Sequence, residues 1–311
     1  MDYIHRPGVK TEKRLGGILY SVVSLAIISG AENDVYPVMN LGADEFDFVT
    51  GFLSSFKNIH IDYIIKSPHE TRVVNLYYKD KTVQFKCPET GALKTYDREE
   101  NSTKPTFPVE FSLIEKALPG MDALLINLVS GIDLTLDTLQ NIRRSFSGYI
   151  HMDLHNLVMN THEDGARTQG PVAGWLEWCR QCTTLQMNES EISVLPAEKL
   201  HEYETAEKIL SDPAVEALVI TRGKLGVTLY ESKQKLSGDE KYYELDRFDL
   251  PAVEQPHFVD STGCGDVFAA GFMFNNCMNE AKNFNMSLNR ANKIASKNAA
   301  LFGVEELPKL G

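Results

Sequence analysis

The sequence predicts a three-layer α/β sandwich with a central, mainly parallel sheet and a small β lid. Two observations carry this prediction. From residue 123 onward, short apolar runs alternate with helical patterns, which is typical of parallel strands covered by helices on both faces of a sheet. Earlier in the chain, the segments 72–79 and 81–87 alternate between apolar and polar residues around a turn at Asp80. This pattern predicts a hairpin that projects as a lid over the α/β core.

The first part of the chain contains one segment with two interpretations. Residues 18–28 are apolar and follow Gly16 and Gly17, so they predict a buried helix that ends at Gly30 as its C-cap. Basic residues precede this stretch and small residues follow it, which also fits a secretion signal. It is too short to cross a membrane. Beyond it we expect a strand at 35–40, a helix at 44–56, a strand at 61–65 and, after the hairpin, a polar stretch over 88–108.

The second part of the chain supplies most of the expected sheet. Strands are predicted at 123–129, 149–154, 184–187, 217–221, 227–231 and 242–245. Helices are predicted at 134–146, 172–182, 189–195, 201–210, 267–278 and 288–301.

Composition limits the classes of function. The chain has 311 residues, of which 43% are hydrophobic and 24% charged, as in a globular protein with a large core. The formal net charge of −12 argues against a nucleic acid partner, and an anionic ligand would have to be held by local donors. Five cysteines without the density of a disulfide scaffold favour a reducing cytoplasm.

The segment Asp260-Ser261-Thr262-Gly263-Cys264-Gly265-Asp266 is the most informative motif. It runs directly into an apolar helix, and the start of a helix offers unpaired N–H groups and the positive end of the dipole to an anion. Glycines let a phosphate approach the backbone closely. A carboxylate beside that anion is better suited to accept a proton than to bind phosphate. We therefore expect phosphoryl transfer, with an anion hole at Gly263, Cys264 and Gly265 and with Asp266 as the general base.

This motif resembles the C-terminal signature of the ribokinase-like, or PfkB, carbohydrate kinase family, with Ser261 and Cys264 in place of the commoner Thr and Ala. The resemblance implies a ribokinase-like fold and an ATP-dependent kinase that phosphorylates a hydroxyl of a small polyol. It also favours a core helix over a secretion signal at 18–28, since family members place such a helix after a Gly-Gly pair. It implies a discontinuous β lid, residues 1–15 and 61–108, and an α/β core, residues 16–60 and 109–311.

Further segments match the family residue by residue. Asn188 and Glu191 match its Asn-x-x-Glu, placed near the nucleotide phosphates and a water-bridged Mg²⁺, although the same pair also fits a helix capping box. The implied ATP contacts are Asn188, Glu191, Thr221, Gly223, Gly226 and Asn292; the implied substrate contacts are Asp2, Gly16, Gly17 and Ser21. Asp260 and Thr262 are implied at a monovalent cation site, for K⁺, that some relatives have.

The sequence also departs from the family pattern. Family members have a strand before the substrate-binding Asp, whereas only Met1 precedes Asp2, and Ser21 stands where Asn is common. A missing central strand would expose the edges of two neighbours. These departures keep a second hypothesis open, that of a non-catalytic ligand-binding or regulatory protein with the same fold.

Three further expectations complete the sequence prediction. The acceptor stays open among sugars, nucleosides and cyclitols, with no membrane partner, and the edge of the lid sheet offers a surface for a homodimer. Cys179 and Cys182 form a Cys-x-x-Cys pair, but late in a predicted helix and before a strand, unlike a redox site. His151, Asp153 and His155 are interpreted as polar residues near the site rather than as metal ligands.

Overall fold

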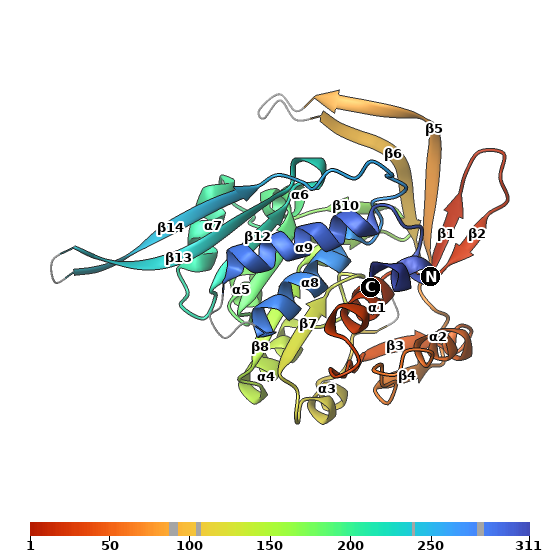
Figure 1. Ribbon diagram of the computed structural model, residues 1–311, viewed down its shortest axis with the longest axis horizontal. Helices are drawn as coiled ribbons and strands as arrows, with labels where there is room; N and C mark the ends of the chain where they lie inside the picture. Colours follow the sequence, from red (N-terminus) through yellow and green to blue (C-terminus); the bar gives the residue numbers. More distant parts are fainter. Residues whose placement is uncertain (87–92, 104–106, 238–239, 279–282) are drawn as a thin grey trace.

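The computed structural model describes residues 1–86, 93–103, 107–237, 240–278 and 283–311. Within these residues the main sheet has six strands in the order β14-β13-β12-β11-β8-β7 (Figure 1). They are β7 (Ala123–Asn127), β8 (Tyr149–Asp153), β11 (Thr184–Asn188), β12 (Ala217–Thr221), β13 (Val227–Ser237) and β14 (Glu240–Leu250). The strands β7, β8, β11 and β12 are parallel, and β13 and β14 are antiparallel to their neighbours. The predicted mainly parallel sheet is confirmed.

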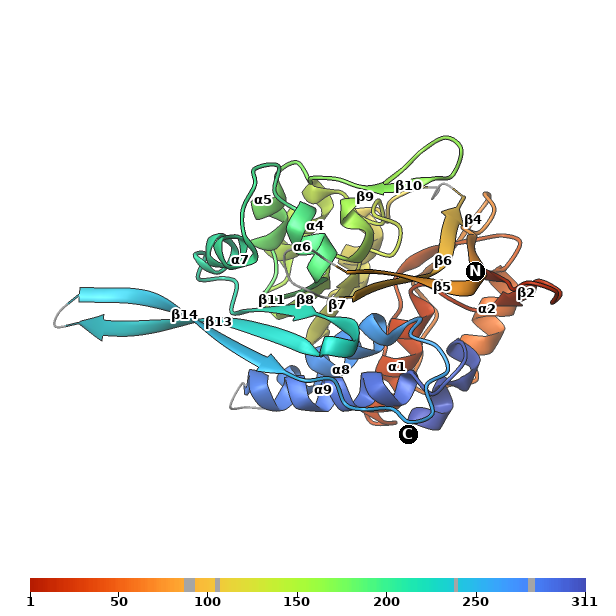
Figure 2. The same cartoon turned by 90° about the horizontal axis from the view of Figure 1, so that it is seen from above.

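Helices cover both faces of this sheet (Figure 2). One layer holds α4 (Leu136–Ser145), α5 (Trp175–Cys179), α6 (Glu189–Val194) and α7 (Glu202–Leu210); the other holds α1 (Leu19–Ser29), α8 (Cys264–Met278) and α9 (Phe284–Asn298). The residues of β12 show how one strand serves both layers. Leu218 and Ile220 pack in the core with α7, while Ala217 and Val219 pack against α8 and α9. The strand β12 is apolar from Ala217 to Ile220 because both of its faces are buried.

The apolar segment after Gly16 and Gly17 forms the core helix α1, with Gly30 at its C-cap, as preferred from the sequence. In the described part of the chain, no helix combines the length and the apolar character that a membrane crossing requires. A small parallel pair, β3 (Met39–Gly42) and β4 (Ile64–Ser67), packs with α2 (Phe46–Leu53) beside α1. Smaller features complete the described part of the core: α3 (Phe111–Ala117), η1 (His155–Val158), η2 (Gly223–Leu225), η3 (Val304–Leu310) and the hairpin β9 (Met159–Thr161)–β10 (Arg167–Gln169).

A separate four-stranded sheet arches over the core (Figure 1). Its order is β2-β1-β5-β6, from β1 (Asp2–His5), β2 (Glu12–Arg14), β5 (Val74–Lys86) and β6 (Leu93–Ser102). The hydroxyl of Tyr78 on β5 donates to Oδ2 of Asp260 over 3.2 Å. This bond joins the arching sheet to the motif at 260–266, so the two are in contact in this structure.

The hairpin predicted at 72–79 and 81–87 is wrong in its pairing. The strand β5 continues through Asp80, and it pairs antiparallel with β6, which lies in the stretch read as a polar connection. Residues 93–102 escaped detection because they are almost wholly polar, and Glu99 and Glu100 are exposed on both faces of the strand. A strand of mostly polar residues carries no alternating apolar pattern. The expected strand end at Cys87, residues 88–92 and residues 104–106 lie outside the described residues.

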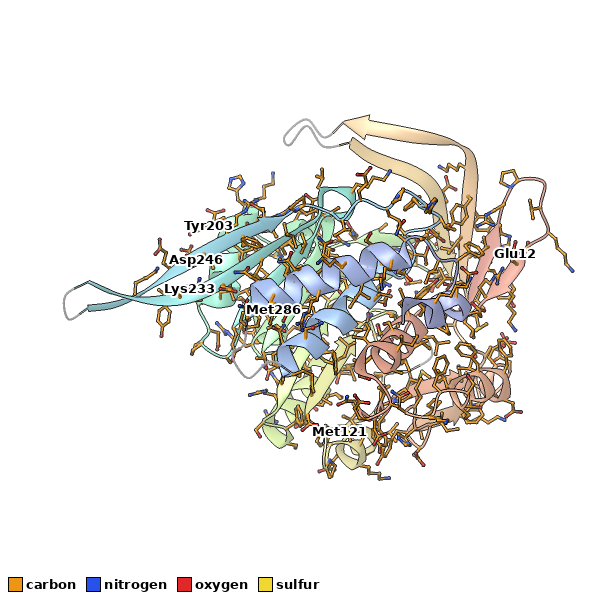
Figure 3. All side chains as sticks on the ribbon, viewed as in Figure 1. Glu12, Met121, Tyr203, Lys233, Asp246 and Met286 are labelled. Carbon is orange, nitrogen blue, oxygen red and sulfur yellow. The ribbon has the colours of Figure 1, made fainter. Side chains whose placement is uncertain are left out.

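The hairpin β13–β14 is longer than predicted, since strands were expected only at 227–231 and 242–245. Its outer part extends beyond the helices, where Lys233 and Asp246 face each other across the two strands (Figure 3). Their Nζ and Oδ2 atoms are 2.6 Å apart. Cross-strand charge pairs of this kind can hold an exposed hairpin, but they give no apolar alternation in the sequence.

Candidate active site

Polar side chains line up at the carboxyl ends of the parallel strands. The pairing register sets Asn127 of β7 opposite Asp153 of β8, and Asp153 opposite Gln186 of β11. One step further, Asn188 lies opposite Thr221 of β12. In open α/β sheets this edge is where ligands bind. The chain therefore brings its predicted site residues to the expected edge of the sheet.

Asp266 lies in the first turn of α8, directly above that edge. Its Oδ1 accepts hydrogen bonds from Nδ2 of Asn127 over 2.6 Å and from Oγ of Ser21 over 3.4 Å. Asn127 also donates to Oγ of Ser21 over 3.0 Å, so the three side chains hold one another. Only 6% of Asn127 is exposed. Asn127 did not appear among the residues predicted from sequence, although its place at the end of an apolar strand was a usable signal.

Enclosure of the Asp266 carboxyl among these side chains raises its pKa to about 7. The hydrogen bonds from Asn127 and Ser21 oppose this shift, whereas the nearby charge of Asp2 adds to it. A carboxylate with a pKa near neutrality can both hold and release a proton under ordinary conditions, which is the property required of a general base.

The glycines of the motif differ in what they contribute. Gly263 has φ of +77°, and a Cβ there would lie 2.1 Å from the ring of Tyr20. A Cβ at Gly265 would meet only Nε2 of Gln186, at 3.9 Å. Gly263 is therefore needed for the backbone turn, while Gly265 leaves open space above the start of the helix.

The start of α8 has N–H groups to offer an anion. The N–H of Cys264 donates to the carbonyl of Ser261, and within the described residues no acceptor is found for the N–H of Gly263 or Gly265. The Cys264 thiol points away from this space and donates to the carbonyl of Ala295 on α9. Of the three residues of the predicted anion hole, the two glycines have free donors.

The predicted acceptor residues lie together near Asp266. A Cβ on Gly16 would lie 2.0 Å from Oδ2 of Asp2, so the absence of a side chain at Gly16 lets the Asp2 carboxylate pack on the backbone. Gly17 has φ of +60° with open space around it. Together with Ser21 and Asn127, these residues line one cavity of about 370 Å³.

This cavity continues beyond the polar residues into an apolar slot. Its walls include residues 123–129, which comprise the edge strand β7 and the two residues after it, and residues 34–42.

Asn188 and Glu191 form a capping box at the start of α6. Oδ1 of Asn188 accepts from the N–H groups of Ser190 and Glu191, and Oε2 of Glu191 accepts from the N–H of Asn188 over 2.7 Å. The capping interpretation of this pair is confirmed; a role toward phosphate and Mg²⁺ stays a prediction. Burial raises the pKa of Glu191 to about 7.

Asp153 adds a third buried carboxyl to the site. Burial first, and then the charges of Glu191 and Asp266, raise its pKa well above the ordinary value. Nε2 of Gln186 donates to Oδ2 of Asp153 and to the carbonyl of Gly265, over 3.0 Å in both cases. Gln186 thus ties the strand edge to the start of α8. The carboxyls of Asp153, Glu191 and Asp266 are close enough for their charges to interact. A bound cation would stabilise their ionised forms.

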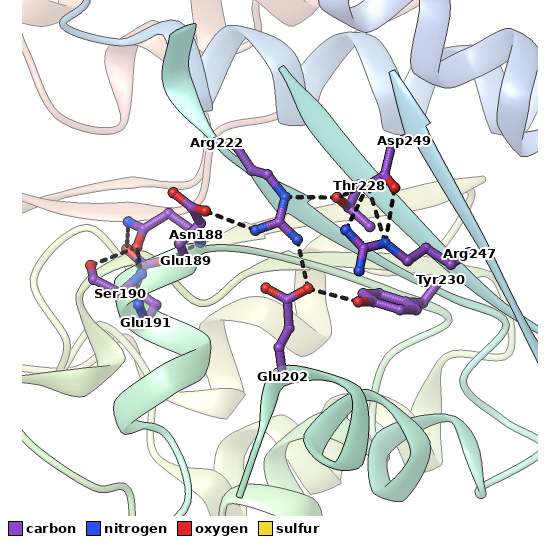
Figure 4. Close-up of polar contacts among 10 residues, drawn as sticks. All are labelled: Asn188, Glu189, Ser190, Glu191, Glu202, Arg222, Thr228, Tyr230, Arg247 and Asp249. Atoms are coloured by element: carbon purple, nitrogen blue, oxygen red, sulfur yellow. Dashed lines mark hydrogen bonds and ion pairs between the residues drawn. The ribbon is translucent and has the colours of Figure 1, made fainter. Parts of the chain in front are cut away.

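Arg222 connects the two loops of the predicted nucleotide site (Figure 4). Its Nη1 and Nη2 pair with Glu189 at 2.8 Å and Glu202 at 2.6 Å, and its Nε donates to Oγ1 of Thr228. Thr221 and Gly223 precede and follow it, and Gly226, with φ of +103°, packs closely on the carbonyl of Leu250. Arg222 thereby fixes this loop to α6 and α7. This bridging role of Arg222 was not predicted from the sequence.

Replacing Arg222 with Met should lower the free energy of unfolding by about 1–3 kcal/mol at pH 7, because Glu202 would lose its partner. Burial alone would raise the pKa of Glu202, but hydrogen bonds from Arg222 and Tyr230 hold it below its ordinary value. This stability is present above the ordinary pKa of about 4.5 and is lost as the pH falls through the lowered value. Urea unfolding at pH 7 and pH 3 should show the larger deficit at pH 7; an equal deficit would contradict the account.

The other predicted residues have partners within the protein. Asn292 donates to the carbonyl of Pro251 over 2.8 Å, which holds the loop after β14 on α9. Oδ1 of Asp260 accepts from the N–H and the hydroxyl of Thr262, at 3.0 and 2.9 Å. These contacts make Asp260 a turn-forming residue; its predicted part in a cation site remains a prediction.

Two sequence features are structural. Cys179 and Cys182 are buried free thiols, and burial raises the pKa of Cys179 to about 12. His151 is buried, bonds to Thr184 and packs on Phe272, so it faces the core and not the site. In the part of the chain that the structure describes, no cluster of three or more His, Cys, Asp or Glu residues could hold a metal ion.

Comparison with known proteins supports the resemblance seen in the motif. A family model described as pfkB family carbohydrate kinase matches residues 166–309, which include the motif at 260–266. The second half of the chain is thus similar to PfkB family carbohydrate kinases. No curated protein matches the chain in sequence.

Solved structures confirm the ribokinase-like fold of the chain. Ribokinase from Thermotoga maritima is 18% identical, with a TM-score of 0.66 over 98% of this chain and 92% of that one. A pyrophosphate-dependent kinase in the ribokinase family, complexed with a pyrophosphate analog and myo-inositol, is 13% identical, with a TM-score of 0.68 over 97% and 94%. The nucleoside kinase of Burkholderia thailandensis with inosine is 15% identical, with a TM-score of 0.66 over 99% and 89%.

Proposed function

We propose that this protein is an ATP-dependent kinase that phosphorylates a hydroxyl group of a small sugar, nucleoside or cyclitol. The observation that carries the proposal is that Asp266 adjoins two groups of residues. Gly263 and Gly265 of the same motif have N–H groups without an acceptor among the described residues. Asn127 and Ser21, which bond to the Asp266 carboxylate, line the cavity together with Asp2 and Gly16. An acceptor in that cavity and a phosphate at the start of α8 would meet at Asp266.

In the reaction, Asp266 takes the proton of the acceptor hydroxyl as its oxygen attacks the terminal phosphorus of the donor. The bond between that phosphorus and the leaving diphosphate oxygen breaks, so that ADP and a phosphorylated acceptor result. The N–H groups of Gly263 and Gly265 stabilise the charge on the transferring phosphoryl group. Asn127 and Ser21 hold Oδ1 of Asp266, which leaves Oδ2 for the acceptor.

The residues present fit Mg²⁺ in one respect. The buried carboxyls of Asp153 and Glu191 would be stabilised by a cation, but the described residues hold no three-ligand cluster. Mg²⁺ would therefore be held mainly by donor phosphates and water, with Glu191 contacting it through water. Bound there, it would neutralise phosphate charge. Asp260 and Thr262 are proposed to contribute to a binding site for a monovalent cation such as K⁺.

Exposed apolar residues support ATP as the donor over pyrophosphate. Leu225 on the Thr221–Gly226 loop is 60% exposed, and Phe258, beneath Lys224, is 55% exposed. Val253 lies on the same loop as Pro251, which Asn292 fixes, and is also exposed. A purine base would cover such a surface, whereas pyrophosphate would leave it in water.

The test is a measurement of product release with two donors. ADP release from ATP, and phosphate transfer from pyrophosphate, are measured against sugars, nucleosides and inositols. One acceptor that stimulates ADP release would support the proposal. If pyrophosphate alone supports transfer, the donor assignment fails while the kinase assignment stands. Silence across the panel, while ATP still protects the protein against heat, would favour a ligand-binding protein.

The rate should depend on pH through Asp266. With a pKa of about 7, kcat/KM should rise about tenfold per pH unit below pH 7 and level off above it, because only the ionised form accepts a proton. Replacing Asn127 with Leu removes a hydrogen bond that lowers this pKa, so the acid limb should move to higher pH. The matched control is Asn141→Leu, on the exposed side of α4. An unmoved limb in Asn127→Leu would contradict the role of Asn127.

A further inference from the structure

Two arginines are buried at the junction of the lid and the core, beside the acceptor cavity. Arg72 precedes β5 and lines the cavity together with Asp2, Gly16 and Asn127. Arg167 begins β10, and its side chain is only 7% exposed. Figure 2 shows the β9–β10 hairpin on the side of the core that the strand β6 of the lid approaches. Two like charges are thus taken out of water next to a polar cavity, which is costly unless something pairs with them.

Arg72 has only neutral partners in the described part of the chain. Its Nη1 donates to the carbonyl of Val129 over 3.1 Å, and its Nη2 donates to Oγ of Ser102 over 3.3 Å. Val129 follows Asn127 by two residues, so this bond places the guanidinium at the acceptor end of β7. Its Nε is buried and has no partner among the described residues.

Arg167 is also incompletely paired. Its Nη1 meets Oε2 of Glu100 at 3.3 Å, while its Nε and Nη2 are buried without a partner among the described residues. Each arginine lowers the pKa of neighbouring His155, after burial, which leaves that side chain neutral. Buried N–H groups of a guanidinium are normally hydrogen-bonded, so the open position of Arg72 at the cavity, with two more on neighbouring Arg167, marks a missing acceptor.

The acidic groups nearby do not fill these positions. Oδ2 of Asp133 accepts from the N–H groups of Ser130 and Gly131, at 2.7 and 3.2 Å, and is turned toward the backbone. Asp2 packs on Gly16. Burial lowers the pKa of Arg72, and the charges of Asp133 and Asp2 oppose this shift without filling the open Nε position. Glu100 is already engaged with Nη1 of Arg167. Because the chain has a net charge of −12, its overall field would not attract an anionic ligand to this place. Such a ligand would have to be held by the guanidinium groups of Arg72 and Arg167.

We propose that the acceptor of this kinase carries an anionic group, a carboxylate or a phosphate, which Arg72 binds with Arg167 beside it. The anionic group would lie at the lid end of the cavity, and the hydroxyl to be phosphorylated would lie at Asp266. A guanidinium pairs with either anion through two parallel hydrogen bonds, and such charge-assisted bonds are strong. This inference rests on the proposed kinase function, and it selects acidic sugars or sugar phosphates within its substrate class.

The test compares each anionic acceptor with a related neutral sugar. ADP release is measured for D-glucose against D-gluconate and for D-ribose against D-ribose 5-phosphate, among other pairs, with the wild type, Arg72→Gln and Arg143→Gln. Arg143, on α4, is the matched control because its guanidinium also donates to a backbone carbonyl, that of Gly148. The better of the carboxylate and phosphate arms identifies the anion.

An anionic acceptor should exceed its neutral counterpart by about 100-fold in kcat/KM for the wild type, as two charge-assisted hydrogen bonds allow. Arg72→Gln should reduce this preference by about 30-fold, mainly through KM, and Arg143→Gln should leave it unchanged. Neutral acceptors that serve equally well, or an Arg72→Gln variant with the full preference, would overturn the inference and leave the kinase function intact.

A second readout separates the inference from the proposed function. The melting temperature of the wild type, without a nucleotide, should rise with the anionic compound and not with its neutral counterpart. Arg72→Gln should lose this rise. If the rise is present but no acceptor is phosphorylated, the anion site stands and the kinase function fails. If no anion raises the melting temperature or is turned over, the anion site is refuted.

Discussion

Replacing Asp266 with Asn should lower kcat by about 10³-fold while the affinity for ATP changes by less than about threefold. Asn keeps the shape of Asp266 and its contact with Ser21, but it cannot take a proton from the acceptor hydroxyl. The free N–H groups of Gly263 and Gly265 stay in place, so the phosphate side of the site is preserved. Initial rates with a saturating acceptor, together with titration of ATP by calorimetry, would measure the two effects separately.

A stability measurement on Asp266→Asn tests whether misfolding causes the loss of turnover. Because enclosure raises the pKa of Asp266 from 3.8 to about 7, the folded protein keeps the proton that the unfolded chain has lost between these values. Ionisation of Asp266 therefore lowers stability as the pH rises from 4 to 7, and Asp266→Asn should remove this contribution while those of Asp153 and Glu191 remain. Asp122→Asn, an exposed change at the other end of β7, is the control. A variant with near-normal turnover would remove Asp266 from the role of base.

Replacing Gly263 with Ala should lower the free energy of unfolding by about 3 kcal/mol. A Cβ there would lie 2.1 Å from the Tyr20 ring, and φ of +77° is unfavourable for any residue with a side chain. Tyr20 is buried in α1 and has no free space to move into. Denaturant unfolding monitored by circular dichroism would measure the loss.

Gly265 provides the matched control, two residues away in the same motif. A Cβ at Gly265 would have its nearest neighbour at 3.9 Å, and the residue lies within the helix α8. Gly265→Ala should therefore fold as well as the wild type, although its methyl group would enter the space proposed for the phosphoryl group and reduce turnover. Equal stability losses in the two variants would show that the turn at Gly263 is not the point of constraint.

The parts of the fold that could be predicted from the sequence are those in which the signal is local. The strands β8, β11 and β12 are buried on both faces, and their apolar runs were recognised within one or two residues. The motif at 260–266 is also contiguous, so Asp266 and its glycines could be named directly. The strand β6 could not be predicted, because its sequence is almost wholly polar and its pairing with β5 depends on tertiary contacts.

Contacts between distant segments account for the site residues that were missed. Asn127 is 139 residues from Asp266 in the sequence, and only the fold brings its amide to the carboxylate. Arg222 stood inside a recognised glycine motif, yet its partners Glu189 and Glu202 belong to helices that precede it. Arg72 lay in a segment interpreted as a strand, so its burial at the cavity was not expected. Such residues have ordinary sequence neighbours and are recognised only by what they touch.

The most direct test of the account is a crystal structure of the protein with ADP, aluminium fluoride, Mg²⁺ and the acceptor found in the turnover panel. The account predicts the fluoride at the N–H groups of Gly263 and Gly265, with the acceptor hydroxyl about 2.6–3.2 Å from Oδ2 of Asp266. A complex in which the fluoride binds away from the start of α8, or in which Asp266 faces no hydroxyl, would contradict it.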